Sequence, residues 1–149
     1  ESDFGTSVEL VKRFLNGGFP LAPNISFGIV DVRDVAQLHL LALESPQASG
    51  NRFIASSETL AIPLISEFLR KKIPEYQKRL PKGTAPDFLI KLLGFFSPLM
   101  KTVANQLGKT KELDNSKAKN ILGWQPRSGE EAVIASAKSL IEFDIVKSP

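Results

Sequence analysis

The hydrophobic pattern of this chain changes period within one short segment, residues 27–42, which read FGIVDVRDVAQLHLLA. The first four of these residues are mostly aromatic or β-branched, as is typical of a buried strand. The later apolar residues recur at helical spacing, and Asp34 has a side chain that can cap a helix. The pattern therefore predicts a strand that leads directly into a helix running from Asp34 to about Glu44.

Helical periodicity also marks much of the remaining chain. We expect helices from about residue 6 to 16, from 63 to 73, in a pair that opens at Pro86 and breaks at Pro98, from 116 to 122, and from 129 to about 143. Capping-box spacing supports two of the starts, Thr6 with Glu9 and Ser128 with Glu131, and Asp114 or Asn115 is expected to cap the helix that Gly123 closes.

A second strand is expected at residues 52–55, after the turn sequence Ser-Gly-Asn. Because a helix separates the two strands, we expect a parallel crossover between them. The polar stretch 75–84 is expected to be an exposed connection, with or without a third short strand. The predicted fold class is α/β, mostly helical, in a single unit over residues 1–149 whose two or three short strands are too few to complete a sheet.

Composition narrows the function classes. The 149 residues are 42% hydrophobic and 23% charged, as in an ordinary globular protein, and the net charge of +3 is scattered rather than gathered in a basic stripe. We therefore expect no nucleic-acid partner. The most apolar run, residues 88–100, is too short and too interrupted to cross a membrane. The absence of cysteine excludes disulfides and thiolate metal sites and suits a cytoplasmic protein.

Few side chains here could carry catalysis. The single histidine, His39, lies within a predicted helix without a second histidine at metal-binding spacing, so a structural role is favoured. The single tyrosine, Tyr76, has Leu80 where a reductase Tyr-x-x-x-Lys pair needs its lysine. The charges of Asp31, Arg33 and Asp34 favour helix capping and a local ion pair over catalysis.

A dinucleotide site is also not expected in this chain. Such a site needs a glycine-rich turn between a strand and a helix N-terminus, where backbone amides approach the pyrophosphate. The Gly17-Gly18 pair instead follows a predicted helix and is expected to end it. We therefore predict no catalytic, cofactor-binding or metal-binding residue here.

Four short segments follow one another in an order typical of one family. They are VRDVA at 32–36 with His39-Leu40 after it, GNRFI at 50–54, SKA at 116–118 with LGWQPR at 122–127, and EEA at 130–132. Together they resemble the second half of extended short-chain dehydrogenase/reductases, in the dihydroflavonol-reductase-like branch of the NAD-dependent epimerase/dehydratase superfamily. The resemblance covers roughly residues 1 to 143.

The resemblance implies an intact enzyme with an N-terminal Rossmann half that binds NAD(P) and carries a Tyr-x-x-x-Lys pair. This chain would be the C-terminal, substrate-side portion of that enzyme and would lack the Rossmann cofactor half. It begins at Glu1 rather than at a methionine, which fits a piece of a longer protein. Alone, it is expected neither to bind NAD(P) nor to transfer hydride.

One departure from the family pattern bears on the substrate. Nucleotide-sugar enzymes of this superfamily often have an arginine at the position of Phe27, and phenylalanine cannot pair with a diphosphate. A small carbonyl or hydroxyl compound with an apolar body is therefore favoured. The expected substrate-binding residues are Phe27, Phe95, Phe96, Leu99 and Met100, with the last four forming part of an apolar lid.

Three functions remain open at this point. The first is the substrate-binding region of an NAD(P)-dependent oxidoreductase. The alternatives are the same region of a nucleotide-sugar epimerase or dehydratase, and a non-catalytic binding or regulatory module that reuses the fold. In each case the missing Rossmann half is an expected partner, and the exposed helix and strand edges predict that the fragment self-associates.

Overall fold

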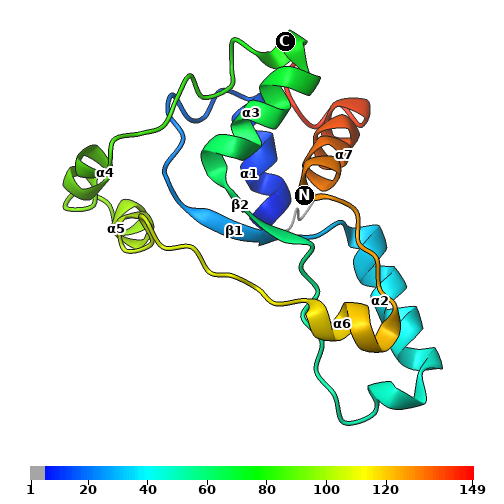
Figure 1. Cartoon of the computed structure of the whole chain (residues 1–149). Coiled ribbons are helices and arrows are strands. Elements are labelled where there is room, and N and C mark those ends of the chain that lie inside the picture. Colours follow the sequence, from blue (N-terminus) through cyan, green and yellow to red (C-terminus); the bar gives the residue numbers. More distant parts are fainter. Residues whose placement is uncertain (1–5) are drawn as a thin grey trace.

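The computed structural model describes residues 6–149, with side chains from Val8 onward other than that of Leu99. Figure 1 shows the arrangement of the elements. In chain order these are α1 (Thr6–Leu15), β1 (Ser26–Ile29), α2 (Val32–Glu44), η1 (Pro46–Ala48), β2 (Glu58–Ala61), α3 (Ile62–Lys72), η2 (Pro74–Tyr76), α4 (Asp87–Leu93), α5 (Pro98–Ala104), α6 (Ser116–Leu122) and α7 (Gly129–Glu142). The mostly helical α/β class predicted from the sequence is confirmed.

The two strands form an antiparallel pair, so the predicted parallel crossover is wrong. Ser26 lies opposite Ala61 and Ile29 lies opposite Glu58. The predicted second strand at residues 52–55 is also wrong, because pairing begins only at Glu58. The reason is where the side chains are buried: Phe53 and Ala55 pack against the cluster between α2 and α6 instead of on a sheet.

Most of the buried apolar surface lies in one cluster, which we call the main core. Helices α1, α3 and α7 surround it, and β2 contributes Leu60 (Figure 1). Its buried members are Val11, Phe14, Leu15, Ala22, Ile25, Leu60, Ile62, Ile65, Leu69, Ile73, Tyr76, Leu80, Val133, Ala137, Leu140 and Val146. The rings of Phe14 and Phe19 meet edge to face, with centroids 5.5 Å apart. The amphipathic spacing of the three helices places their apolar faces in this core.

A smaller cluster lies between α2 and α6, which run side by side in Figure 1. It consists of Leu38, Ala118, Leu122 and Trp124, and we call it the α2–α6 cluster. The Lys117 ammonium lies over the Phe53 ring, 5.7 Å from its centroid, on the edge of this cluster. The molecule therefore has two apolar centres, and the segment from β1 to α2 connects them.

Stretch 75–84 is only partly the exposed connection expected from its polar sequence. Tyr76 and Leu80 are buried in the main core, because the chain turns back over the end of α3 through η2. An isolated parallel bridge joins Ala22 to Thr84 at the end of the stretch. Apolar residues spaced four apart anchor the segment, although most of its side chains are polar.

Several predicted helix ends agree well with the structure, namely the end of α1 and the starts of α6 and α7. Ser128 and Glu131 form the expected capping box at the start of α7, and Gly17 ends α1 with φ of 76°. The Asp114 carboxylate accepts from the Ser116 backbone N–H at 2.8 Å at the start of α6. The predicted pairing of Thr6 with Glu9 lies outside the side chains that the structure describes.

No helix in the described range, 6–149, is both long and apolar enough to span a membrane.

Candidate functional site

The charged hinge between β1 and α2 is organised by Asp31. Its backbone is extended, and its carboxylate accepts from the Arg33 backbone N–H at 2.9 Å, so Asp31 caps α2. The same carboxylate accepts from Arg33 Nε at 2.8 Å and from Arg33 Nη2 at 2.6 Å. These hydrogen bonds to Arg33 lower the pKa of the Asp31 carboxyl to about 2, against the opposing effect of burial. The predicted local ion pair is therefore present at Asp31.

The prediction that Asp34 caps this helix is wrong, because α2 begins two residues earlier, at Val32. Asp34 lies inside the first turn and is almost completely buried. Its carboxylate forms an ion pair with the Arg127 guanidinium and accepts from the Arg127 backbone N–H at 2.8 Å. Its backbone carbonyl accepts from the Trp124 indole N–H at 2.8 Å. Asp34 thus fastens α2 to the corner between α6 and α7.

The five predicted substrate-binding residues fall in two places. Phe27 lies on β1 opposite Leu60, with 40% of its surface exposed. Phe95 and Phe96 form the turn between α4 and α5 and are 85% and 82% exposed. Leu99 and Met100 belong to α5, where Met100 is half-buried. The structure therefore groups four of the five in one helical pair and places Phe27 in the sheet.

This helical pair, residues 87–104, will be called the α4–α5 arm. Its two helices pack on each other and lie apart from α1, α3 and α7 in Figure 1. Val103 anchors the arm on the main core, and the Gly108 backbone N–H donates to the Asn24 carbonyl at 3.3 Å where the chain leaves it. Beyond that point the Thr59 hydroxyl donates to the Lys111 carbonyl at 2.9 Å. The chain that leaves the arm therefore crosses the sheet that carries Phe27.

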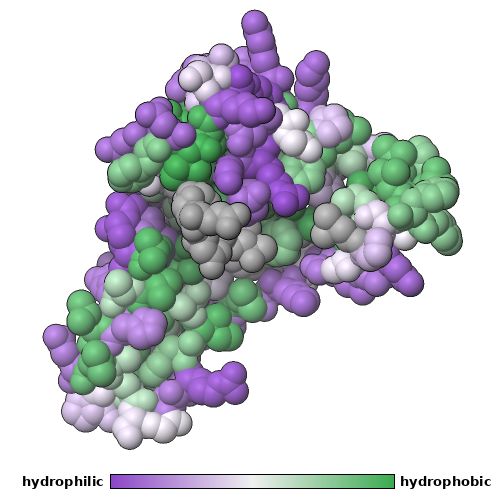
Figure 2. Space-filling view, turned by 180° about the vertical axis from the view of Figure 1, so that it is seen from behind, coloured by the Kyte–Doolittle hydropathy of each residue, from purple (hydrophilic) through white to green (hydrophobic). Residues whose placement is uncertain are grey.

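The outer surface of the arm is apolar. Phe88, Leu92 and Leu93 of α4 are exposed together with Phe95 and Phe96. Figure 2, seen from behind, shows hydrophobic surface gathered at the end of the molecule where the arm lies. Sequence analysis singled out only the C-terminal part of this group. The spacing of Phe88, Leu92 and Phe95, at i, i+4 and i+7, was the available signal that α4 contributes to the same surface.

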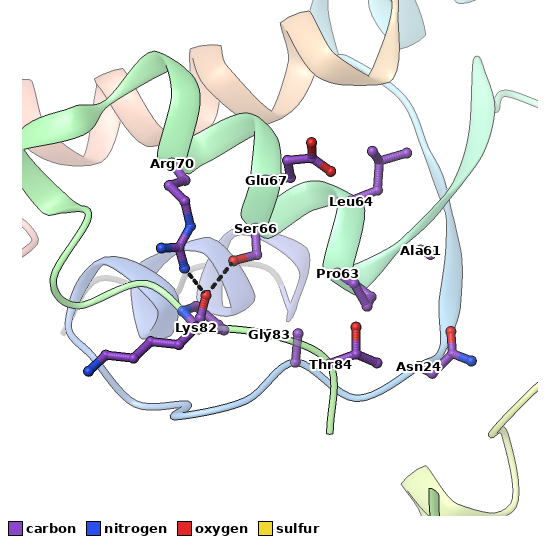
Figure 3. A pocket seen from close by; sticks show the side chains of 12 residues that line it. Asn24, Ala61, Pro63, Leu64, Ser66, Glu67, Arg70, Lys82, Gly83 and Thr84 are labelled. Carbon is purple, nitrogen blue, oxygen red and sulfur yellow. Dashed lines mark hydrogen bonds between the residues drawn. The ribbon is translucent and has the colours of Figure 1, made fainter. Parts of the chain in front are cut away.

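Two hollows lie elsewhere on the described part of the chain. One, of about 520 Å³, is bounded by α3 and residues 81–84, and Figure 3 shows Ser66 and Arg70 at its wall, both donating to the Pro81 carbonyl. The other, of about 610 Å³, lies beside Trp124 and Arg127. Of the predicted substrate-binding residues with described side chains, none lines either hollow. In each hollow, some of the polar groups already form hydrogen bonds within the protein: Ser66 and Arg70 to the Pro81 carbonyl in the first, and Arg127 to Asp34 in the second.

The two residues with possible acid-base chemistry have structural surroundings. Nδ1 of His39 lies 2.8 Å from the Val35 carbonyl oxygen on the exposed side of α2. Tyr76 is buried in the main core, with the Arg79 guanidinium 5.9 Å from its ring centroid. Within the described residues, no group of three or more histidine, aspartate or glutamate side chains is placed to hold a metal ion.

Comparison with known proteins identifies the class. The chain matches no protein-family model. It is 34% identical over 134 residues to the ketoreductase azaE of Aspergillus niger, a match that covers 89% of this chain and 34% of that protein. It is 29% identical over 140 residues to the NADPH-dependent methylglyoxal reductase GRE2 of Saccharomyces cerevisiae, covering 93% and 36%. Cinnamoyl-CoA reductase 2 of Arabidopsis thaliana is 37% identical over 76 residues, which are 51% of this chain and 23% of that enzyme.

Solved structures are similar to this chain over nearly its whole length, as the first two sequence relatives are. The yeast methylglyoxal/isovaleraldehyde reductase Gre2, solved as a complex with NADPH, matches 97% of this chain and 38% of its own with a TM-score of 0.70 and 25% identity. The structure of gox2253 matches 96% of this chain and 46% of its own, with a TM-score of 0.75. At 19% identity, the latter shows the shared fold alone.

These matches confirm the family resemblance of the hinge and corner segments. Over most of its length the chain is homologous to the ketoreductase and methylglyoxal reductases of the extended short-chain dehydrogenase/reductase family, in its dihydroflavonol-reductase-like branch, and it is related to NADPH-dependent carbonyl reductases. It spans about a third of the length of the curated relatives it matches.

Proposed function

We propose that this chain is the C-terminal, substrate-side region of an NADPH-dependent carbonyl reductase. The observation that carries the proposal is the match of nearly nine-tenths of the chain to a ketoreductase of which it covers 34%. Carbonyl reduction needs a hydride at the carbonyl carbon, which NADPH would supply, and a proton at the carbonyl oxygen. A cofactor-binding region would supply both, so this chain alone binds substrate without reducing it.

The surface of α2 supports such a partner region. Val32, Leu40 and Leu43 lie on one side of the helix at helical spacing and are 77%, 59% and 83% exposed. They lie opposite Leu38, which faces the α2–α6 cluster. A helix that is apolar on both sides is typical of one packed between two bodies. The proposed Rossmann half covers this exposed stripe in the intact enzyme.

The extended segment Arg52–Ala55 supports the same arrangement. Its side chains alternate between exposed Arg52 and Ile54 and half-buried Phe53 and Ala55, as in a strand with one face covered. No ladder within the described residues uses its backbone groups. An extended segment with free backbone groups is a ready edge for another strand. In our proposal this edge joins the sheet of the cofactor half.

The proposed substrate site lies where Phe27 and the α4–α5 arm would face that half. Phe95, Phe96, Leu99 and Met100 would cover the apolar body of the substrate. Phe27 would exclude a diphosphate from the position where nucleotide-sugar enzymes bind one. Residues 1–149 are proposed to act as one unit in this role.

A chimera tests the function directly. The matching segment of the yeast methylglyoxal reductase is replaced by this chain, and NADPH consumption is measured with a panel of aldehydes and ketones. We expect carbonyl reduction by the chimera and none by the chain alone, with lower activity when Phe95 and Phe96 are both changed to serine. The matched control changes Lys71 and Lys78 to glutamine, on exposed positions outside the arm.

A chimera that folds and binds NADPH but reduces no carbonyl compound would overturn the proposal. Tight binding of UDP-sugars by that chimera would favour the nucleotide-sugar alternative. A folded chimera that binds NADPH but neither reduces carbonyl compounds nor binds UDP-sugars would favour the regulatory module.

A further inference from the structure

The exposed surface of the α4–α5 arm carries positive charge as well as apolar side chains. Lys91 lies three residues after Phe88 and four before Phe95, so these side chains share one face of the arm. All three positions are exposed. The ammonium group of Lys91 therefore lies within the apolar surface rather than on its opposite side.

The close packing of the arm brings a second lysine to the same end. A Cβ atom at Gly94 would lie 3.3 Å from Cα of Lys101, so glycine lets α4 approach the backbone of α5 at this point. Lys101 is exposed on α5, and its backbone lies against Gly94, the residue before Phe95. Each helix of the arm therefore contributes one exposed lysine near the turn that carries the two phenylalanines.

The arm has more positive than negative charge. Asp87, at the start of α4, is its one acidic residue, against the two lysines Lys91 and Lys101. Beyond Asp87, from Phe88 to Lys111, the sequence contains four lysines, at 91, 101, 109 and 111, and neither aspartate nor glutamate. The arm therefore combines an apolar surface with a net positive charge, which attracts amphiphiles of negative charge.

We propose that the arm selects carbonyl substrates that combine an apolar body with a negatively charged group. The proposal rests on the proposed function and specifies its substrate class. Phe95 and Phe96 contact the apolar body, and Lys91 and Lys101 pair with the anionic group. A single small molecule is the occupant, held between the arm and the rest of the intact enzyme.

Binding of matched ten-carbon probes to this chain tests the charge preference. Decanoate and 1-decanol, below their aggregation concentrations, are titrated into isotope-labelled protein, and backbone amide shifts are followed by NMR. We expect shifts in residues 88–103 for both probes, with decanoate binding about fivefold to tenfold more tightly, because each exposed ion pair contributes modestly. The preference should shrink as salt is raised, since exposed charges are screened.

Variants separate the two contributions. Changing Lys91 and Lys101 together to glutamine should remove the preference for decanoate and leave 1-decanol binding unchanged. Changing Phe95 and Phe96 together to serine should weaken both probes. The matched control, Lys71 and Lys78 changed to glutamine, removes the same charge from exposed positions outside the arm and should change neither.

Three results would overturn the inference. These are equal affinity for the two probes, shifts confined to residues outside the arm, and binding to vesicles of anionic phospholipid without binding of monomeric decanoate. The inference can fail independently of the proposed function. An active chimera with no preference for charged aldehydes rejects the inference alone, whereas an inactive chimera together with a decanoate preference in the chain rejects the reductase assignment.

Discussion

The main core and the α4–α5 arm contain similar residues and use them in opposite ways. Phe14 in α1 is completely buried against Phe19, whereas Phe95 at the tip of the arm is 85% exposed. Phe14 lies in an amphipathic helix, and Phe95 lies in the turn that directly follows the amphipathic helix α4. The difference shows that an apolar helix face indicates a contact but does not identify the partner. In the core the partner is another helix of this chain, and at the arm it is proposed to be substrate.

The largest expected effect is on the core side of this comparison. Changing Phe14 to alanine should lower the free energy of unfolding by about 3–5 kcal/mol, because it removes a ring and leaves a cavity. The matched change of Phe96 to alanine should alter it by less than about 0.5 kcal/mol. Urea denaturation measures both. Similar losses for the two variants would show that the arm is part of the stability core.

A smaller effect is expected at the joint between the main core and the α2–α6 cluster. Changing Asp34 to asparagine removes the ion pair with Arg127 and should cost about 1–3 kcal/mol, since Asp34 is buried and Arg127 is partly exposed. Hydrogen exchange should quicken first in α2 and α6. The control is Asp87 changed to asparagine at an exposed position. Uniform loosening of α1, α3 and α7 instead would contradict a local role for the joint.

The hinge should also make stability depend on pH. The pKa of Asp31 is lowered to about 2 by its hydrogen bonds to Arg33, so its contribution is complete above the ordinary aspartate value and is lost as pH falls toward 2. We expect a loss of about 1–2 kcal/mol over that range, because exposed Arg33 is screened by solvent. Urea unfolding at several pH values measures it. The same pH slope in the Asp31→Asn variant would exclude this cause.

Self-association is the weakest expected effect and compares the two exposed apolar surfaces. Serine at Val32 and Leu43 should reduce association more than serine at Phe95 and Phe96, because the α2 stripe is proposed to face another body in the intact enzyme and is left uncovered in this chain. Sedimentation velocity of both double variants against the parent chain measures this. A parent chain that remains strictly monomeric at moderate concentration would contradict the prediction.

Local signals in the sequence determined most helix positions. The bounds of α6 and α7 follow from side chains within a few residues of each end, namely the Asp114 carboxylate, Gly123 and the capping box of Ser128 and Glu131. The four segments that resemble the family could also be recognised from the sequence, because each is a short continuous run of residues. Such features need no information from distant parts of the chain.

Tertiary structure alone decided the strand pairing, the role of Asp34 and the exposure of the arm. Strands β1 and β2 pair although more than twenty residues, including the whole of α2, separate them in the sequence. Asp34 has a side chain that can cap a helix, but its carboxylate instead accepts from Arg127, which is distant in the sequence. Phe95 and Phe96 are the same residue type as Phe14 in the core, and they differ from it in that no other part of this chain covers them. Helix caps are local interactions that the sequence specifies directly, whereas burial and long-range pairing depend on which distant surfaces come together.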